Sequence, residues 1–358
     1  MRIAEVCREA WRDVASGASW AGTWAMVFGV LLTGIVGIRT ADLAGDVRSA
    51  AAYVASGAAT TVQRAEGRID GRACDALASS EGVVASGALR RVEHGAVAAS
   101  LPGSAVPTYE VTPGMLRVLG AGASAERPGV VLSPSVRESL GTRPGEELVL
   151  VDGTTAPVAG SFAYPDDGRD PDLEHALLAQ AVDDGRAYDA CWVTVWPQRD
   201  ATVQMLRRTV LASTGAEDED PPTLGQLNPR PGAVFTPSGE VYVTVPLGAA
   251  ALSGVAVGGA AVLRRRLSLA ADLHVGVPRS AQVLGTVLQH AVWAGVAVLA
   301  PVAVSAVVTR GLPPDDALPI VLGACEVAAV GFIATLAGGA AAASCVRERA
   351  LHRYFRTR

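Results

Sequence analysis

The stretch LRRRLSLAADLHVGVPRSAQVLGTVLQHA, residues 263–291, places a short basic segment between two long apolar runs. The neighbouring runs 245–263 and 282–309 contain no ionisable side chain other than that of His290. About 20 mainly apolar residues are enough for a helix to cross a bilayer. We therefore predict that residues 264–281 form a loop at one membrane surface, where a partner can act on two spans at once.

The composition predicts a membrane protein. The chain has 358 residues, of which 50% are hydrophobic and 18% charged, and its mean hydropathy is +0.31. Such a composition is too apolar for an ordinary soluble chain of this length. All 30 basic residues are Arg, and the absence of Lys excludes a Lys-dependent phosphate loop. The sequence has no G-x-S-x-G, H-E-x-x-H or C-x-x-C motif, so we expect no catalytic site, metal site or cofactor in this chain.

Four spans are predicted, and the distribution of Arg orients them. Residues 1–18, 264–281 and 347–358 contain 3, 4 and 5 Arg, and basic residues near span ends favour the cytoplasmic side. Both termini are therefore expected in the cytoplasm, in a multi-pass protein of the cytoplasmic membrane whose first span is a retained anchor. The expected order is an interfacial helix 1–18, span 19–38, an extracytoplasmic domain 39–244, span 245–263, a coupling segment 264–281, span 282–309, an external loop 310–317, span 318–346 and a basic tail 347–358.

The N-terminal segment predicts an amphipathic helix. Its apolar residues recur at helical spacing with charged residues between them: Ile3, Val6, Cys7, Ala10, Trp11 and Val14. A helix with this pattern beside a span is expected to lie in the membrane interface.

The segment 39–244 predicts an extracytoplasmic mixed α/β domain. It holds 17 Arg against 27 acidic residues. We expect the first helix to continue through the Ala-rich segment 40–68. Expected strands are 82–84, 108–111, 130–132, 147–151, 192–196 and 240–245, and expected helices are 73–79, 134–140 and 200–214. The acidic run 216–222 is expected to be a solvated loop rather than a metal site.

The polar residues of the apolar segments and the cysteines leave alternatives open. Glu326 within the fourth span is expected to face a helix interface, and His290 either pairs with it or lies near the inner membrane surface. The small residues 337–344 predict close helix packing or dimerisation. Cys74 and Cys191 are the two cysteines of the exterior domain, where disulfides persist; a bridge and two free buried thiols both stay open.

Three stretches and the topology resemble a known family. They are the interfacial REAWRDV (8–14), the exterior VVLSPSVRESLGTRPGEELVL (130–150) and the opening stretch itself. Together they resemble the FtsX-like or MacB-like permease subunits of ABC transporters, the type VII or mechanotransmission group. The matching positions are Leu140, Gly141, Gly145, Glu146, Arg264, Arg265, Arg266, Gly276 and Arg279. The chain departs from the family pattern at Leu267 and Gln289, where acidic residues are common in the family.

The resemblance implies a permease that binds no nucleotide itself. A separate ABC ATPase would bind ATP and Mg, and a second permease chain, identical or not, would pair with this one. The helix 267–273 would be the coupling element between this chain and the ATPase, with the Arg264–Arg266 cluster at the lipid headgroups. The implied contacts to the ATPase are Leu267, Leu269, Ala270, Leu273, His274, Gly276 and Arg279.

The implied function is export or extraction of an amphiphilic peptide, lipoprotein or antibiotic. A regulatory transducer that activates a cell-wall hydrolase or a sensor kinase is the alternative, and an anchored receptor without an ATPase is a third class. An extracytoplasmic protein stays open as a further partner, and no nucleic acid is expected.

Overall fold

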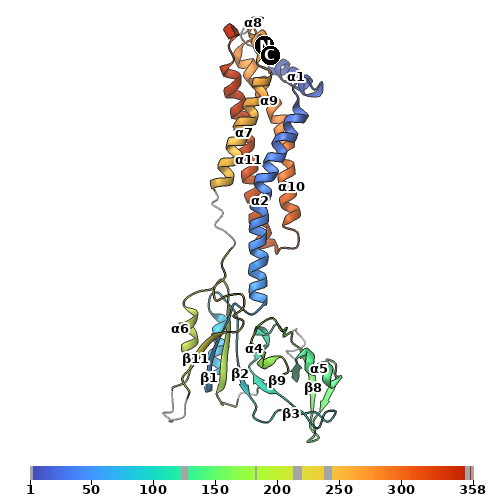
Figure 1. Ribbon diagram of the computed structural model, residues 1–358, viewed down its shortest axis with the longest axis vertical. Helices are drawn as coiled ribbons and strands as arrows, with labels where there is room; N and C mark the ends of the chain where they lie inside the picture. Colours follow the sequence, from blue (N-terminus) through green and yellow to red (C-terminus); the bar gives the residue numbers. More distant parts are fainter. Residues whose placement is uncertain are drawn as a thin grey trace. The chain divides into compact units, whose positions relative to one another are not determined.

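The computed structural model describes residues 3–121, 128–181, 184–212, 220–237, 244–350 and 355. The chain divides into two compact units. Met1–Ser49 with Pro237–Arg358 form one, called here the helical unit, and Ala50–Thr236 form the other, called the sheet unit. Figure 1 shows the elements of both.

Within the described ranges, four helical segments are long and apolar enough to cross a membrane. The third is divided at Val298, because Pro301 has no N–H to donate to the carbonyl of Ala297. The first extends well beyond the predicted span. The segments are α2 (Ala21–Ala55), α7 (Thr244–Arg264), α9 (Arg279–Ala297) with α10 (Leu299–Val308), and α11 (Pro314–Cys345).

Glycines let α7 and α11 pack backbone to backbone. A Cβ atom on Gly254 would lie 2.5 Å from the carbonyl oxygen of Gly331, and one on Gly258 would lie 2.2 Å from that of Thr335. Small residues at such contacts are the usual basis of helix association in lipid, where burial of apolar side chains gives little preference for protein over lipid. The close packing predicted for the small residues 337–344 is also observed, since a Cβ atom on Gly338 would lie 2.6 Å from the carbonyl oxygen of Val255 on α7.

Three short elements lie at one end of the helical unit. Helix α1 (Ile3–Ala15) packs along α9, and α8 (Arg266–His274) connects α7 to α9. The turn η4 (Glu348–Ala350), which follows α11, contacts α8, with His274 Nδ1 2.8 Å from Glu348 Oε1. Figure 1 shows α1 and α8 at this end and the loop between α10 and α11 at the other. The described parts of the segments expected to share one side of the membrane thus gather at one end of the unit.

The sheet unit is built on a mixed sheet. Among the described residues nine strands pair in the order β11-β1-β10-β2-β5-β9-β6-β8-β7, antiparallel except for the parallel pairs β5 with β9 and β6 with β8. The strands are β1 (Thr60–Ile69), β2 (Val83–Arg91), β5 (Thr108–Val111), β6 (Val130–Leu132), β7 (Glu147–Val149), β8 (Thr155–Ser161), β9 (Leu177–Gln180), β10 (Tyr188–Val195) and β11 (Thr223–Gln226). Strands β3 (Ala96–Val97) and β4 (Ala105–Val106) form a separate ribbon.

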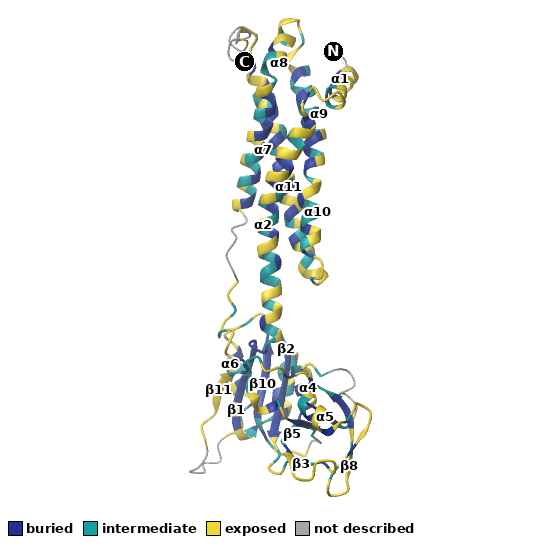
Figure 2. Cartoon of the chain, turned by 45° about the vertical axis from the view of Figure 1, so that its right-hand side comes forward, coloured by how far each residue is buried: buried dark blue, intermediate teal, exposed yellow. Residues whose placement is uncertain are grey.

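Short helices complete the core of the sheet unit. Helices α3 and α4 pack on β2 and β10, and a Cβ on Gly87 would lie 2.0 Å from the backbone nitrogen of Met115, so β2 needs glycine where α4 approaches. Figure 2 shows the central strands β1, β10 and β2 largely buried. The helices are α3 (Gly71–Ala76) with η1 (Leu77–Ser79), α4 (Pro113–Val118), α5 (Pro134–Leu140), η3 (Pro171–Leu173) and α6 (Thr202–Arg207).

The predicted class of the exterior domain is observed, with corrections in detail. Strands β5 and β6 and helix α5 have the predicted bounds. The helix expected over 40–68 ends at Ala55, and β1 starts at Thr60, where Thr60, Thr61 and Val62 favour a strand. Two predicted segments fall largely outside the described residues, which omit 213–219 and 238–243. Of the strand expected at 240–245, only Thr244 and Val245 are described, and they belong to α7. Of the acidic run 216–222, only 220–222 are described.

Candidate functional site

The coupling segment, residues 264–281, forms a helix and a tight turn. Helix α8 ends at His274, and Gly276 follows with a φ of +93°, a conformation that other residues adopt only with strain. The backbone N–H of Val277 donates to the carbonyl of Asp272, and Pro278 is the N-cap of α9, which begins at Arg279. The side chain of Val275 at the turn is 78% exposed. The segment therefore presents a short exposed tip, Ala271–Gly276, between two membrane helices.

The apolar face of α8 is turned inward. Leu269 and Ala270 are buried in a cluster with Val262, Ala343 and Val346, and Leu273 packs against the same cluster half-buried. The chain itself thus covers Leu269 and Ala270, and their predicted contact with an ATPase stays a prediction. Leu267 is half-buried, whereas His274, Gly276 and Arg279 are exposed. The exposed residues of the tip, together with Arg279, are therefore accessible to a partner.

Arg265 joins three helices through a hydrogen-bonded triad, called here the coupling triad. Its guanidinium donates to the Asp13 carboxylate at 2.7 Å and to Gln289 Oε1 at 2.6 Å. The Gln289 amide donates in turn to Asp13 at 3.0 Å. Asp13 lies near the C-terminal end of α1, after the buried Val6 and Ala10, and Gln289 lies on α9. The triad therefore ties α1, the α7–α8 junction and α9 into one polar connection.

Two residues of the Arg264–Arg266 cluster make different contacts within the chain. Arg264 stacks over the ring of Trp20, with its guanidinium carbon 3.9 Å from the ring centroid. Trp20 has a φ of +54° at the turn from α1 into α2. Cation–π contacts of this kind stabilise an exposed pair by about 0.5–1 kcal/mol. Within the chain, Arg265 thus belongs to the coupling triad and Arg264 contacts the turn before α2. The placement of the triplet at the lipid headgroups stays a prediction.

A small cavity of about 70 Å³ lies between α1 and the coupling segment. Asp13, Arg265, Asp272 and Gln282 line it, and the Gln282 amide donates to the carbonyl of Leu269 at 2.7 Å. Partial burial raises the pKa of Asp272, the Asp13 charge adds to this, and Arg265 opposes it. Charged side chains of α1 and of the coupling segment thus lie close together around this cavity. A displacement of α8 would therefore change contacts on α1 and α9.

The two ionisable residues of the third and fourth spans lie apart. His290 is buried, with Nε2 3.1 Å from the carbonyl of Gly258 on α7 and Nδ1 2.8 Å from that of Thr286. Its ring faces Gly339, where a Cβ would lie 2.8 Å away. Glu326 is 13 residues from Gly339 along α11, roughly 20 Å at the rise of a helix, and its side chain is exposed. His290 connects helices, and the structure does not pair it with Glu326.

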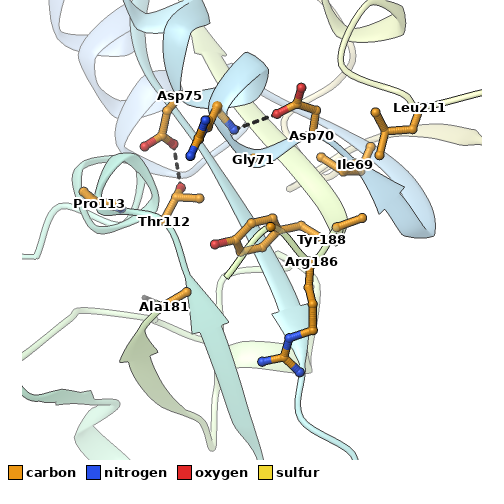
Figure 3. A pocket seen from close by; sticks show the side chains of 13 residues that line it. Ile69, Asp70, Gly71, Asp75, Thr112, Pro113, Ala181, Arg186, Tyr188 and Leu211 are labelled. Carbon is orange, nitrogen blue, oxygen red and sulfur yellow. Dashed lines mark hydrogen bonds between the residues drawn. The ribbon is translucent and has the colours of Figure 1, made fainter. Parts of the chain in front are cut away.

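The sheet unit contains a cavity of about 500 Å³, shown in Figure 3. Asp75 anchors one wall by accepting hydrogen bonds from the Thr112 hydroxyl at 2.5 Å and the Gly114 N–H at 3.2 Å. Tyr188 forms another wall; burial raises the pKa of its hydroxyl, and the nearby Arg90 opposes this shift. Gly71 has no side chain where the Tyr188 ring lies, since a Cβ there would be 2.4 Å from a ring carbon.

The structure pairs Cys74 with Cys191 in a disulfide, with Cα atoms 5.9 Å apart. The bond holds α3, which contributes Gly71 and Asp75, on strand β10, which contributes Tyr188. Cys7, Cys325 and Cys345 are free and exposed. Behind Tyr188, Arg90 is paired with Glu110 and Asp184, and the hydrogen bonds from Arg90 and Arg186 hold the pKa of Asp184 well below its usual range. No His, Cys, Asp and Glu group of metal-binding geometry occurs among the described residues.

Sequence reasoning missed the coupling triad and the cavity. Asp13 lies 252 residues from Arg265, and no local pattern marks such a contact. The one available signal was Gln289, at which the sequence departs from the family pattern, because a long polar side chain within an apolar span needs a partner.

Comparisons with known proteins give a weak result. No protein-family model matches the chain, and no curated protein matches its sequence. Of solved structures, 16 chains match it, among them the periplasmic region of MacB from Actinobacillus actinomycetemcomitans. That match has a TM-score of 0.32 and 11% sequence identity, and it covers 41% of this chain and 79% of the other. A similarity of this size indicates no shared function.

Proposed function

We propose that this chain is the permease subunit of an ABC transporter complex. A separate cytoplasmic ATPase docks on the coupling segment, and ATP binding and hydrolysis there move the membrane helices and, through them, the extracytoplasmic sheet unit. The substrate class that we propose is an amphiphilic peptide, lipoprotein or antibiotic, exported or extracted at the outer leaflet. Both termini lie in the cytoplasm in this account.

The geometry of the coupling segment is the observation that carries the proposal. Its tip is exposed, its apolar face is buried against the C-terminal ends of α7 and α11, and its base is fixed by the coupling triad. A short helix held at its base and exposed at its tip suits the transmission of a push to α7, α9 and α1 together. A loop that merely linked two spans would need neither the triad nor the buried face.

Nucleotide chemistry belongs to the partner in this proposal. The chain lacks Lys altogether, and a P-loop requires one. ATP and Mg would therefore be bound by the ATPase subunit, and a second permease chain would bring a second ATPase beside the first.

Val275→Asp tests the docking surface. Val275 is 78% exposed at the tip, so the substitution disturbs little within the chain, whereas a charge in an apolar contact should reduce retention of the ATPase at least about tenfold. The measurement is the amount of ATPase that copurifies with the tagged full-length chain in mild detergent.

Val234→Asp is the matched control, since Val234 is 69% exposed in the sheet unit. The control should retain the ATPase like the unchanged chain. If both variants retained the ATPase equally, the tip would not be its docking surface.

A further inference from the structure

Glu326 has an unusual position for an acidic residue. It lies in the middle of α11, one of the four helices apolar enough to cross a membrane, and its side chain is exposed on the surface of the chain. Among the described residues it has neither a hydrogen-bond partner nor an ion pair. A carboxylate that faces lipid at this depth is costly, so such residues normally face protein. The surface around Glu326 is therefore expected to be covered by another chain.

A base lies close to Glu326 on the neighbouring helix. Arg39 of α2 reaches α11, where its Nη1 is 3.5 Å from the carbonyl oxygen of Gly323. Gly323 is about one helical turn from Glu326. The structure nevertheless leaves the acid unpaired, because the guanidinium is directed at the backbone. The single chain thus presents one acid and one base, about a turn apart, that do not form an ion pair with each other.

The same face of α11 is suited to close contact with another helix. Leu318, Leu322 and Ile333 are 60%, 58% and 63% exposed. Together with Glu326 and the exposed Ala329 they recur at spacings of three or four residues. Ala329, Ala337 and Ala341, also exposed, lie between or beyond them. Small residues on such a face let two helices approach closely in lipid.

We propose that a second copy of this chain covers this face, with Arg39 of each copy paired with Glu326 of the other. A two-fold interface is self-complementary, so a face that carries both an acid and a base can form two equivalent ion pairs with its own copy. Each Glu326 site is incomplete in one chain and is completed by the second. The inference rests on the proposed function in one respect: it identifies the face through which the two permease chains meet.

The test mixes two chains with opposite charge reversals. In Arg39→Glu, two acids would face each other across both contacts of a homodimer, and in Glu326→Arg two bases would do so. In the mixed pair, one contact joins the two substituted positions with their charges exchanged, and the other joins the native Glu326 of one chain to the native Arg39 of the other. Both contacts are then attractive. The measurement is copurification of two differently tagged full-length chains from membranes, without an ATPase.

We expect unchanged chains to copurify and each variant to lose copurification with itself by at least about tenfold, since an unpaired charge in an interface is strongly unfavourable. The mixed variants should copurify at close to the unchanged level, which would also show that both are folded. Asp316→Arg, which adds a base at the exposed end of the same helix, should leave pairing intact. If the ion pair forms within one chain instead, mixing the variants rescues nothing, and the proposal is wrong.

A second measurement does not depend on charge. With Cys7, Cys325 and Cys345 replaced by Ala, Ile333→Cys should form a covalent dimer when membranes are treated with an oxidant. Leu252→Cys, 75% exposed on α7, is the control and should stay monomeric. Absence of an Ile333→Cys dimer would place the contact elsewhere. Because neither experiment includes the ATPase, its docking at Val275 can succeed or fail independently of this result.

Discussion

At the scale of single residues, Arg265 determines how the coupling end is held together. It is the common partner of Asp13 and Gln289, with about a quarter of its side chain exposed. Partly buried charged hydrogen bonds of this kind each contribute about 1.5–3 kcal/mol when complete and leave a desolvated charge when one partner is removed. The residue therefore connects the position of α8 to the positions of α1 and α9.

Arg265→Leu should separate docking from coupling. The exposed tip is unchanged, so the ATPase should still bind within about twofold, while stimulation of its activity by the permease should fall at least several-fold because α8 loses its polar connection to α1 and α9. Arg310→Leu, in the loop at the other end of the helical unit, is the control. Full stimulation by Arg265→Leu would show that the coupling triad is structural only.

Gly258 tests the packing of α7 on α11. A side chain there would meet the carbonyl of Thr335, so Gly258→Val should destabilise the helical unit by about 1–3 kcal/mol. Gly259→Val is a neighbouring control, because a Cβ at Gly259 meets nothing within 4 Å. The two midpoints of thermal unfolding in detergent should differ clearly, and identical midpoints would contradict the observed packing.

At the scale of elements, the disulfide fixes helix α3 to strand β10. It joins residues 117 apart in sequence, and a cross-link over a loop of that length stabilises by about 2–5 kcal/mol. Replacing Cys74 and Cys191 by Ala should make the sheet unit more sensitive to protease, whereas replacing Cys325 and Cys345 should not. A mass map without reductant that finds Cys74 and Cys191 as free thiols would contradict the pairing.

Ion pairs of the sheet unit predict a response to acid. Hydrogen bonds from Arg169 and Arg90 lower the pKa of Asp167 and Asp184 below the ordinary value of 3.8. A lowered pKa means that the stabilisation is complete above pH 3.8 and is lost as the pH falls towards the folded-state value. The sheet unit should unfold more readily at pH 3 than at pH 5, and Arg90→Met should weaken this difference. Unfolding that is equal at both pH values would show that these pairs contribute little.

The elements that could be predicted were those with strong local signals. In α5, Ser133 caps the first turn, Pro134 starts the helix and Gly141 ends it with a φ of +64°, and its bounds were correct. Most of strand β1 was predicted as helix, because the Ala-rich sequence before it favours helix and the change to strand-forming residues begins only at Thr60. The end strand β11, TLGQ, has little apolar pattern, so its sequence does not predict a strand. It is a strand because its backbone pairs with β1.

At the scale of the whole molecule, the four spans and the mixed α/β domain could be predicted because composition and length determine them. The candidate site could be predicted only in outline. The position of the coupling segment follows from the apolar runs beside it, but which side of α8 faces inward depends on Ala343 and Val346, more than 70 residues away. The coupling triad and the unpaired Glu326 likewise depend on contacts between distant helices.

The central claim is that a separate ATPase acts on this chain at the coupling segment. The most direct measurement is affinity purification of the full-length chain in mild detergent, with identification of every protein that remains bound. The account predicts an ATPase with Walker motifs in near-stoichiometric amount, retained by the unchanged chain and lost from Val275→Asp. A folded, disulfide-bonded chain that retains no ATPase from its native membranes would contradict it.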